Sequence, residues 1–174
     1  MSIPKSKREQ SKLQVVSDAY KIRKKLTDEL LRDFGYKEKD VVKKYEHLGQ
    51  KMIAPEQRED WVNAQVDRTL TFNQWFIHHE REVVLDLARE IPLNLVAANS
   101  IFPVNMTEFE ERRLCLDRAL QACNKLQQEL QYIVETLPVD VNKYTNIVLE
   151  VEEEYHKIKA LRKSDNRFLK YIKQ

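Results

Sequence analysis

Apolar residues recur every three or four positions along most of this chain, the spacing that aligns them on one face of an α-helix. The first such stretch follows Ser11, a candidate helix cap, and ends at Gly35, where the chain can turn through a left-handed conformation. Residues 1–10 are polar and basic, and we expect them to form a flexible arm. A short, highly charged helix is predicted to stop around Gly49, within an insertion that spans residues 36–60.

Three further long helices are predicted after this insertion. The first begins near Pro55, because proline is favourable in a first helical turn, and Pro92 is expected to kink or break it. The next begins at residues 107–110, where the sequence T-E-F-E matches a capping box. Either Asp140 or Asn142 is expected to cap the last helix.

Helices that are apolar on one side bury that side against one another. The chain contains only 2 Gly and 5 Pro, so few positions favour turns. We therefore predict a single all-α domain over residues 1–174, an antiparallel four-helix bundle with a short helical insertion between the first and second long helices. The aromatic residues Phe72, Trp75 and Phe76 have helical spacing and are expected in the core or in a subunit interface.

Composition indicates where such a protein resides. Hydrophobic residues make up 42% and charged residues 33% of the chain, which is typical of a folded protein with a charged surface. No apolar run approaches the length that spans a bilayer, and the N-terminus lacks the apolar stretch of a signal peptide. Cys115 and Cys123 would lie roughly 12 Å apart on one helix, too far for a disulfide. We therefore expect reduced thiols, a cytoplasmic location and no membrane partner.

The sequence contains few candidate catalytic residues. The stretch H-H-E-R-E at residues 78–82 superficially resembles a zinc helix, but Val83 stands four positions after His79, where the motif needs its second histidine. We expect His78 and Glu82 to form a solvated pair instead. Glu153 and His156 match half of a di-metal motif, and no second helix supplies the other half. The acidic residues 150–154 are predicted to form a solvated face. We expect a non-enzymatic protein without a metal or other cofactor.

Charge is distributed unevenly along the chain, although the total is only +2. Residues 156–174 contain seven basic residues and one acidic residue, and residues 1–12 contain four basic residues and one acidic residue. Residues 129–154 contain seven acidic residues and one basic residue. Both ends of the chain are therefore basic, including a basic tail at residues 164–174. The acidic segment, residues 129–154, directly precedes the basic C-terminal end.

Clustered cations favour a polyanion, because each neutralised phosphate releases counterions. The helix dipole alone accounts for two or three bases in a last turn, but not for a basic arm at the other terminus. The tail aromatic residues can stack on bases or serve as hydrophobic anchors. The candidate nucleic-acid ligands are Lys157, Lys159, Arg162, Lys163, Arg167 and Lys170, followed by Lys5, Lys7 and Arg8 in the arm.

Four short motifs resemble those of a known family. The arm reads M-S-I-P-K-S-K-R, the second long helix ends in A-x-N-S-I at residues 97–101, and the third contains A-C-N-K-L at residues 122–126. The last helix closes on K-x-x-R-K-S-D-x-R at residues 159–167. Together they resemble the Avd-like four-helix-bundle proteins of diversity-generating retroelements, which are related in fold to proteins of ribosomal-RNA intervening sequences. The insertion at residues 36–60 departs from the compact pattern of that family.

The resemblance implies a non-enzymatic accessory protein that assembles as a homo-oligomer, a pentamer in the family. Such a protein binds a reverse transcriptase and its template RNA and supports synthesis of complementary DNA, with DNA as a second candidate ligand. The bases that match the closing motif are Lys159, Arg162, Lys163 and Arg167. The alternative is a helical protein–protein interaction scaffold with no nucleic-acid role.

Overall fold

The structure is a computed structural model that describes residues 5–32 and 34–172. All regular structure in these residues is helical, so the predicted all-α class is confirmed. No helix in this part of the chain is long and apolar enough to cross a membrane. The elements are α1 (Lys5–Lys25), η1 (Leu26–Leu30), α2 (Glu38–Met52), α3 (Pro55–Ser100), α4 (Met106–Thr136), α5 (Val141–Ser164) and η2 (Asp165–Lys170).

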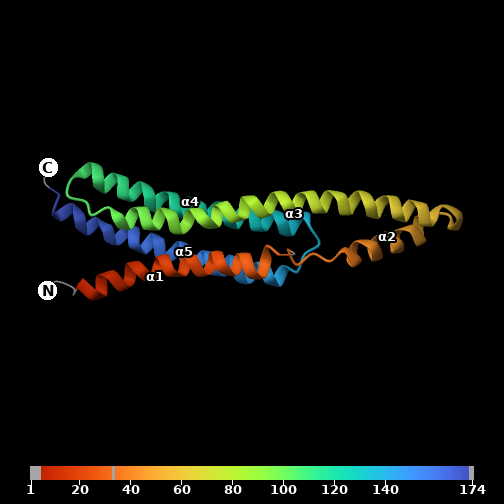
Figure 1. Ribbon diagram of the computed structural model, residues 1–174, viewed down its shortest axis with the longest axis horizontal. Coiled ribbons are helices and arrows are strands. Elements are labelled where there is room, and N and C mark those ends of the chain that lie inside the picture. Colours follow the sequence, from red (N-terminus) through yellow and green to blue (C-terminus); the bar gives the residue numbers. More distant parts are fainter. Residues whose placement is uncertain (1–4, 33, 173–174) are drawn as a thin grey trace.

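Four helices lie side by side and form what we call the helical body: α1, α4, α5 and the C-terminal part of α3 (Figure 1). Within it, α1 and α4 each pack against both α3 and α5. Their facing sides share one apolar core, with Leu26, Leu116 and Ile158 fully buried. Burial of each such side chain contributes about 1.5–3 kcal/mol, so apolar packing holds the helices together.

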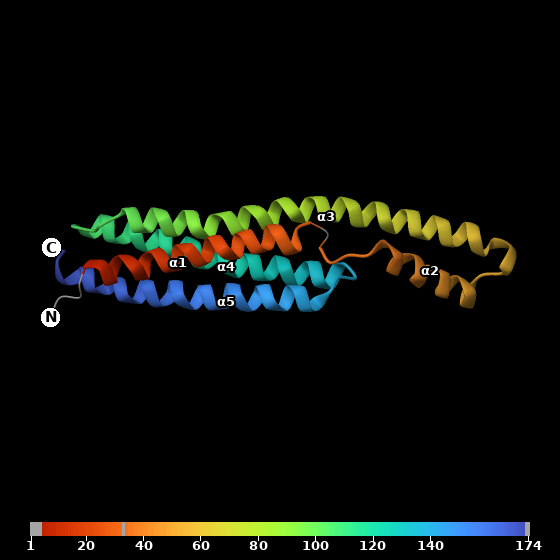
Figure 2. The same cartoon turned by 60° about the horizontal axis from the view of Figure 1, so that its bottom comes forward.

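α3 is the longest element, with 46 residues, or about 69 Å at 1.5 Å per residue. Its N-terminal part extends beyond the helical body, and α2 packs back along it as a projecting hairpin (Figures 1 and 2). The predicted insertion at residues 36–60 therefore forms α2 and the first turn of α3.

Gly49 lies inside α2, which continues to Met52, so the prediction that this helix stops around Gly49 is wrong. A Cβ atom at Gly49 would stand 2.8 Å from Cγ2 of Val62 on α3. Glycine therefore permits a close approach of two helices here. Arg58 closes the turn between them by donating to the carbonyl oxygens of Gly49 (3.2 Å) and Ile53 (3.3 Å).

One helix start differs from the prediction, and a predicted helix break is absent. α1 begins at Lys5, so Ser11 is not its cap, and residues 5–10 of the predicted flexible arm are helical. The remainder of that arm, residues 1–4, lies outside the described residues. Pro92 does not break α3, which continues to Ser100. The Pro92 side chain is buried, and packing of this face against the core offsets the loss of one backbone donor.

The start of α4 also differs from the predicted capping box. Asn105, and not Thr107, is the cap, and its side-chain oxygen accepts from the Glu108 amide at 2.9 Å. Glu108 in turn accepts from the amide of Val104 at 2.8 Å. A side-chain cap with a carboxylate three residues on is thus present two residues before the predicted position, but the cap is an amide and the carboxylate bonds the residue that precedes it. Asp140 caps α5 as predicted, accepting from the Asn142 amide at 3.1 Å.

The predicted left-handed turn after α1 is confirmed, since Gly35 has a φ of 66°. Both cysteines are buried and free, as expected. Burial is the main cause that raises the pKa of the Cys123 thiol to about 12, so it stays protonated. The aromatic residues of α3 that were predicted to lie in the core or in an interface differ in burial: Phe76 is in the core, whereas Trp75 is 60% exposed.

Candidate nucleic-acid interface

The two basic ends of the chain lie at the same end of the helical body (Figure 1). The first turns of α1, the last turns of α5 and the connection between α3 and α4 all reach this end, which is opposite the projecting hairpin (Figures 1 and 2). Basic segments from opposite ends of the sequence are therefore neighbours in space. The backbone of Lys5, Lys7 and Arg8 belongs to α1, and their side chains lie outside the described residues.

The single acidic residue of the last segment, Asp165, does not reach the surface. It is fully buried at the start of η2, where Arg112 of α4 donates to it from Nε at 2.5 Å and from Nη2 at 3.3 Å. Arg112 also donates to the carbonyl oxygens of Ala98 and Ile101, the latter at 3.0 Å, at the end of α3. This pair ties three elements together and removes the only negative charge of the segment from its surface.

Lys157 is the first of the predicted ligands that the structure assigns to an internal contact. Its Nζ donates to Glu153 at 2.8 Å and to Asp18 of α1 at 3.1 Å. The hydrogen bond to Glu153 is the largest cause that raises the pKa of Lys157 to about 12. Lys157 therefore joins α1 to α5, and it is not free to contact phosphates without breaking these bonds.

Arg162 is likewise paired. Its Nη2 donates to Asp117 of α4 at 3.0 Å, and both side chains are about one third exposed. The bond links α5 to α4 on the flank of the helical body. The sequence pattern did not reveal this pairing, because the two residues are far apart in the chain.

The other four predicted ligands of the last segment form what we call the basic rim: Lys159, Lys163, Arg167 and Lys170. The three lysines are exposed, and none of the four forms a salt bridge within the described residues. The Lys159 ammonium lies 5.9 Å from the centre of the Tyr155 ring. The Arg167 guanidinium lies 5.3 Å from the centre of the Phe168 ring. These cations remain available to an anionic partner.

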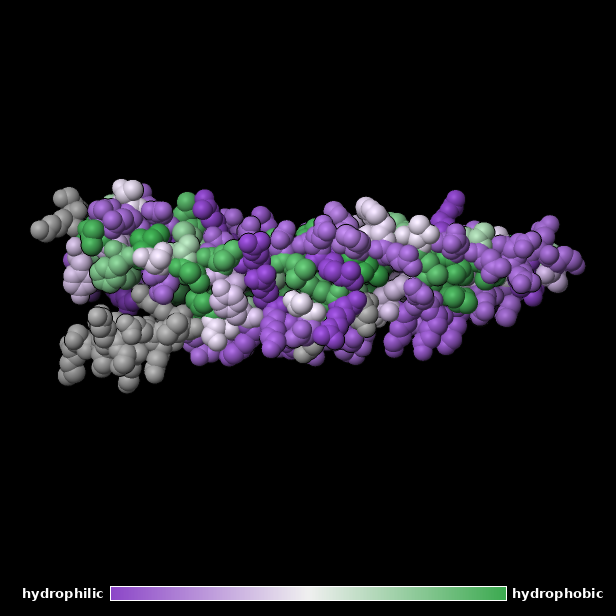
Figure 3. Space-filling model, in the orientation of Figure 1, coloured by the Kyte–Doolittle hydropathy of each residue, from purple (hydrophilic) through white to green (hydrophobic). Residues whose placement is uncertain are grey.

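Aromatic side chains accompany the basic rim. Phe168 is buried, with the Arg112 guanidinium 5.5 Å from its ring centre, and Phe102 packs edge-on against it at 5.4 Å. Phe102 itself is 72% exposed, and Tyr171 is 77% exposed. Apolar side chains also reach the surface at this end in the view of Figure 3. The sequence drew attention to the tail aromatics, whereas Phe102 became visible only once its loop was placed beside them.

The predicted solvated face at residues 150–154 is present in part: the side chains of Glu150, Glu152 and Glu153 are 40%, 47% and 68% exposed. Glu150 pairs with Lys25 of α1, and Glu154 is 1% exposed. Residues of α1 cover this side of α5, because α1 and α5 pack against each other. Only part of the acidic stretch is therefore in contact with solvent.

The residues considered for metal binding have other partners. His78 faces Glu82 at 3.8 Å on an exposed surface, as a solvated pair would. Glu153 bonds Lys157, while His156 faces Glu152 at 3.0 Å. Within the described residues, no group of three or more His, Cys, Asp or Glu side chains is arranged to hold a metal ion.

Comparisons with known proteins found no relative of this chain. No family model, curated protein or solved structure matches the chain.

Proposed function

We propose that this protein is a non-enzymatic accessory protein that binds nucleic acid, chiefly RNA, through the basic rim. The observation that carries the proposal is the division between paired and unpaired cations. Lys157 and Arg162 bond to carboxylates, whereas the rim cations have no such partner in the described residues, and Asp165 is neutralised by Arg112. Several unpaired cations at one end favour a polyanion through counterion release.

The polymerase partner in this proposal comes from the sequence motifs. The resemblance to Avd-like proteins leads us to propose a reverse transcriptase and its template RNA as partners, in complementary DNA synthesis of a diversity-generating retroelement. We propose an antiparallel four-helix bundle located in the cytoplasm and assembled as a homo-oligomer, a pentamer as in that family. The side-by-side packing of α1, α3, α4 and α5 supports the bundle, and the exposed Trp75 supports a subunit contact. A repeated rim would add avidity for RNA.

The test replaces Lys159, Lys163 and Lys170 with glutamine. We expect weaker RNA binding and a salt dependence whose log–log slope is smaller by about 2, since each lost contact with single-stranded phosphate removes about 0.7. The matched control replaces Lys39, Lys43 and Lys51 with glutamine, which removes the same charge from exposed positions on α2. Filter binding over a salt series measures both variants. Unchanged affinity and slope in the rim variant would contradict the proposal.

A protein–protein interaction scaffold is the second candidate function. The observation that favours it is an aromatic cluster on the outer faces of α3 and α4, where Phe72, Trp75 and Tyr132 are each about half exposed or more. A scaffold without a nucleic-acid role would retain neither random RNA nor duplex DNA on a filter at low salt. Co-elution with a reverse transcriptase and a multimeric light-scattering mass would favour the accessory function.

A further inference from the structure

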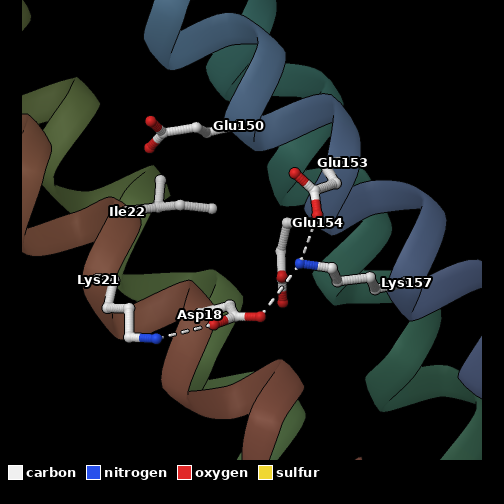
Figure 4. Close-up of a pocket in the computed structure, with 7 residues that line it drawn as sticks. All are labelled: Asp18, Lys21, Ile22, Glu150, Glu153, Glu154 and Lys157. Carbon is white, nitrogen blue, oxygen red and sulfur yellow. Dashed lines mark hydrogen bonds and ion pairs between the residues drawn. The ribbon is translucent and has the colours of Figure 1, made fainter.

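A cavity of about 180 Å³ lies between α1 and α5 in the middle of the helical body. Figure 4 shows that charged side chains from the two helices point into it from opposite sides. The lining residues are Asp18, Lys21 and Ile22 from α1, and Glu150, Glu153, Glu154 and Lys157 from α5.

Three of the four carboxylates in this cavity have ammonium partners. Asp18 accepts from Lys21 at 3.2 Å and from Lys157 at 3.1 Å. Lys157 also donates to Glu153 at 2.8 Å, and Glu150 pairs with Lys25. Three ammonium groups therefore face four carboxylates, and one negative charge remains to be neutralised.

Glu154 is the carboxylate without a partner. It is 1% exposed, and neither of its oxygens has a hydrogen-bond partner within the described residues. Figure 4 shows its carboxyl group pointing from α5 towards Asp18 of α1. A buried carboxylate that lacks a partner is costly when ionised, whereas a protonated carboxyl group is neutral and gains a donor.

We propose that Glu154 is a proton-binding site that couples the docking of α1 onto α5 to pH. With the proton bound, the carboxyl group is neutral and allows α1 to pack closely. Without the proton, two negative charges face each other across the α1–α5 contact and weaken it.

The titratable groups around Glu154 come from three helices. Asp18 and Lys21 belong to α1, and Glu150, Glu153 and Lys157 belong to its own helix, α5. On α4, Cys123 feels the charge of Glu154, and its thiol is neutral. No residue of α3 lines the cavity in the described part of the chain.

The direction of the pH effect follows from the environment of Glu154. Burial is the largest cause that raises its pKa to about 7, and the charges of Asp18 and Glu153 add to it, while Lys157 acts in the opposite sense. In the unfolded chain the group ionises near its ordinary pKa of about 4.3. The folded protein therefore holds an extra proton between these values, so its stability falls as pH rises through this window and then levels off above about pH 7.

Glu154→Gln tests the proposal, because glutamine resembles the protonated side chain at every pH. At pH ~8.5 we expect the unfolding equilibrium constant of the variant to be several hundredfold lower than that of the wild-type protein, since the two pKa values differ by about 2.7. This advantage should shrink by about tenfold for each pH unit below 7. Glu153→Gln is the matched control: it removes the same charge from an exposed neighbour and should give no such gain. Urea titrations measure both variants.

A Glu154→Gln variant no more stable than wild type at pH ~8.5 would overturn the proposal, as would an equal gain from Glu153→Gln. Carbon NMR of the Glu154 carboxyl group in wild-type protein provides a test that does not depend on the variant. An inflection near pH 7 is expected, and ionisation below about pH 5 would overturn the assignment.

Two further readouts on wild-type protein distinguish a bound proton from a bound metal cation and test the coupling to docking. Replacing sodium by tetramethylammonium at constant ionic strength should leave the stability curve unchanged, and a dependence on sodium would indicate a metal cation in place of the proton. Amide exchange, corrected for its intrinsic pH dependence, should accelerate in α1 more than in α4 between about pH 6 and about pH 8.5. Equal protection of α1 at both pH values would overturn the coupling to docking.

Discussion

Arg112 is the residue on which most of the structure at the basic end depends. Its guanidinium contacts the Asp165 carboxylate, two carbonyl oxygens at the end of α3 and the face of Phe168. The side chains of Arg112 and Asp165 are both removed from water, so each charge needs the other as its counterion. The sequence offered one signal for this role: Arg112 interrupts the apolar stripe that Phe109 and Leu116 continue.

Asp165→Asn should be strongly destabilising, because it leaves the Arg112 charge buried without its counterion. We expect the free energy of unfolding to fall by about 3–5 kcal/mol, as measured by urea denaturation. Asp86→Asn, on the exposed face of α3, makes the same chemical change and should cost less than about 0.5 kcal/mol. A loss below about 1 kcal/mol in Asp165→Asn would show that the ion pair is not needed.

At the scale of elements, apolar periodicity predicted the existence of every α-helix, whereas several boundaries required tertiary context. Of the two outcomes expected at Pro92, a break is excluded, because α3 continues past this buried residue to Ser100. The sequence also placed two helix starts too late: α1 begins at Lys5 and α4 is capped by Asn105. In the sequence, Gly49 resembles a glycine that ends a helix. Its actual role, the close contact with Val62, depends on the neighbouring helix and cannot be seen in the sequence of α2 alone.

The direction in which Gly49→Ala changes amide exchange in α2 tests that contact. Helix propensity alone favours alanine over glycine by about 1 kcal/mol, so at an unhindered site the substitution would slow amide exchange. The structure predicts the opposite, because the new methyl group would lie 2.8 Å from a Val62 methyl and push α2 away from α3. We expect faster amide exchange throughout α2.

Gln50→Ala, on the exposed side of α2, is the control for Gly49→Ala and should not accelerate this exchange. Slower exchange in Gly49→Ala than in the wild-type protein would mean that the two helices have room to spare.

For the whole molecule, the important feature is the separation of a basic end from a projecting hairpin (Figure 1). Charge counting along the sequence predicted the six candidate ligands of the last segment as one group. The structure divides them, because Lys157 and Arg162 meet carboxylates from α1 and α4 that are distant in sequence. Sequence patterns locate charge along the chain, but only the packing of helices decides which charges are already neutralised.

The most direct test of RNA binding at the basic rim is chemical footprinting of lysines with and without a bound RNA. Acetylation followed by mass spectrometry reports the accessibility of each ammonium group in the intact protein. Binding at the basic rim predicts that RNA protects Lys159, Lys163 and Lys170, while Lys39, Lys43 and Lys51 on the projecting hairpin stay reactive. Protection of the hairpin lysines instead, or no protection of the rim at saturating RNA, would contradict it.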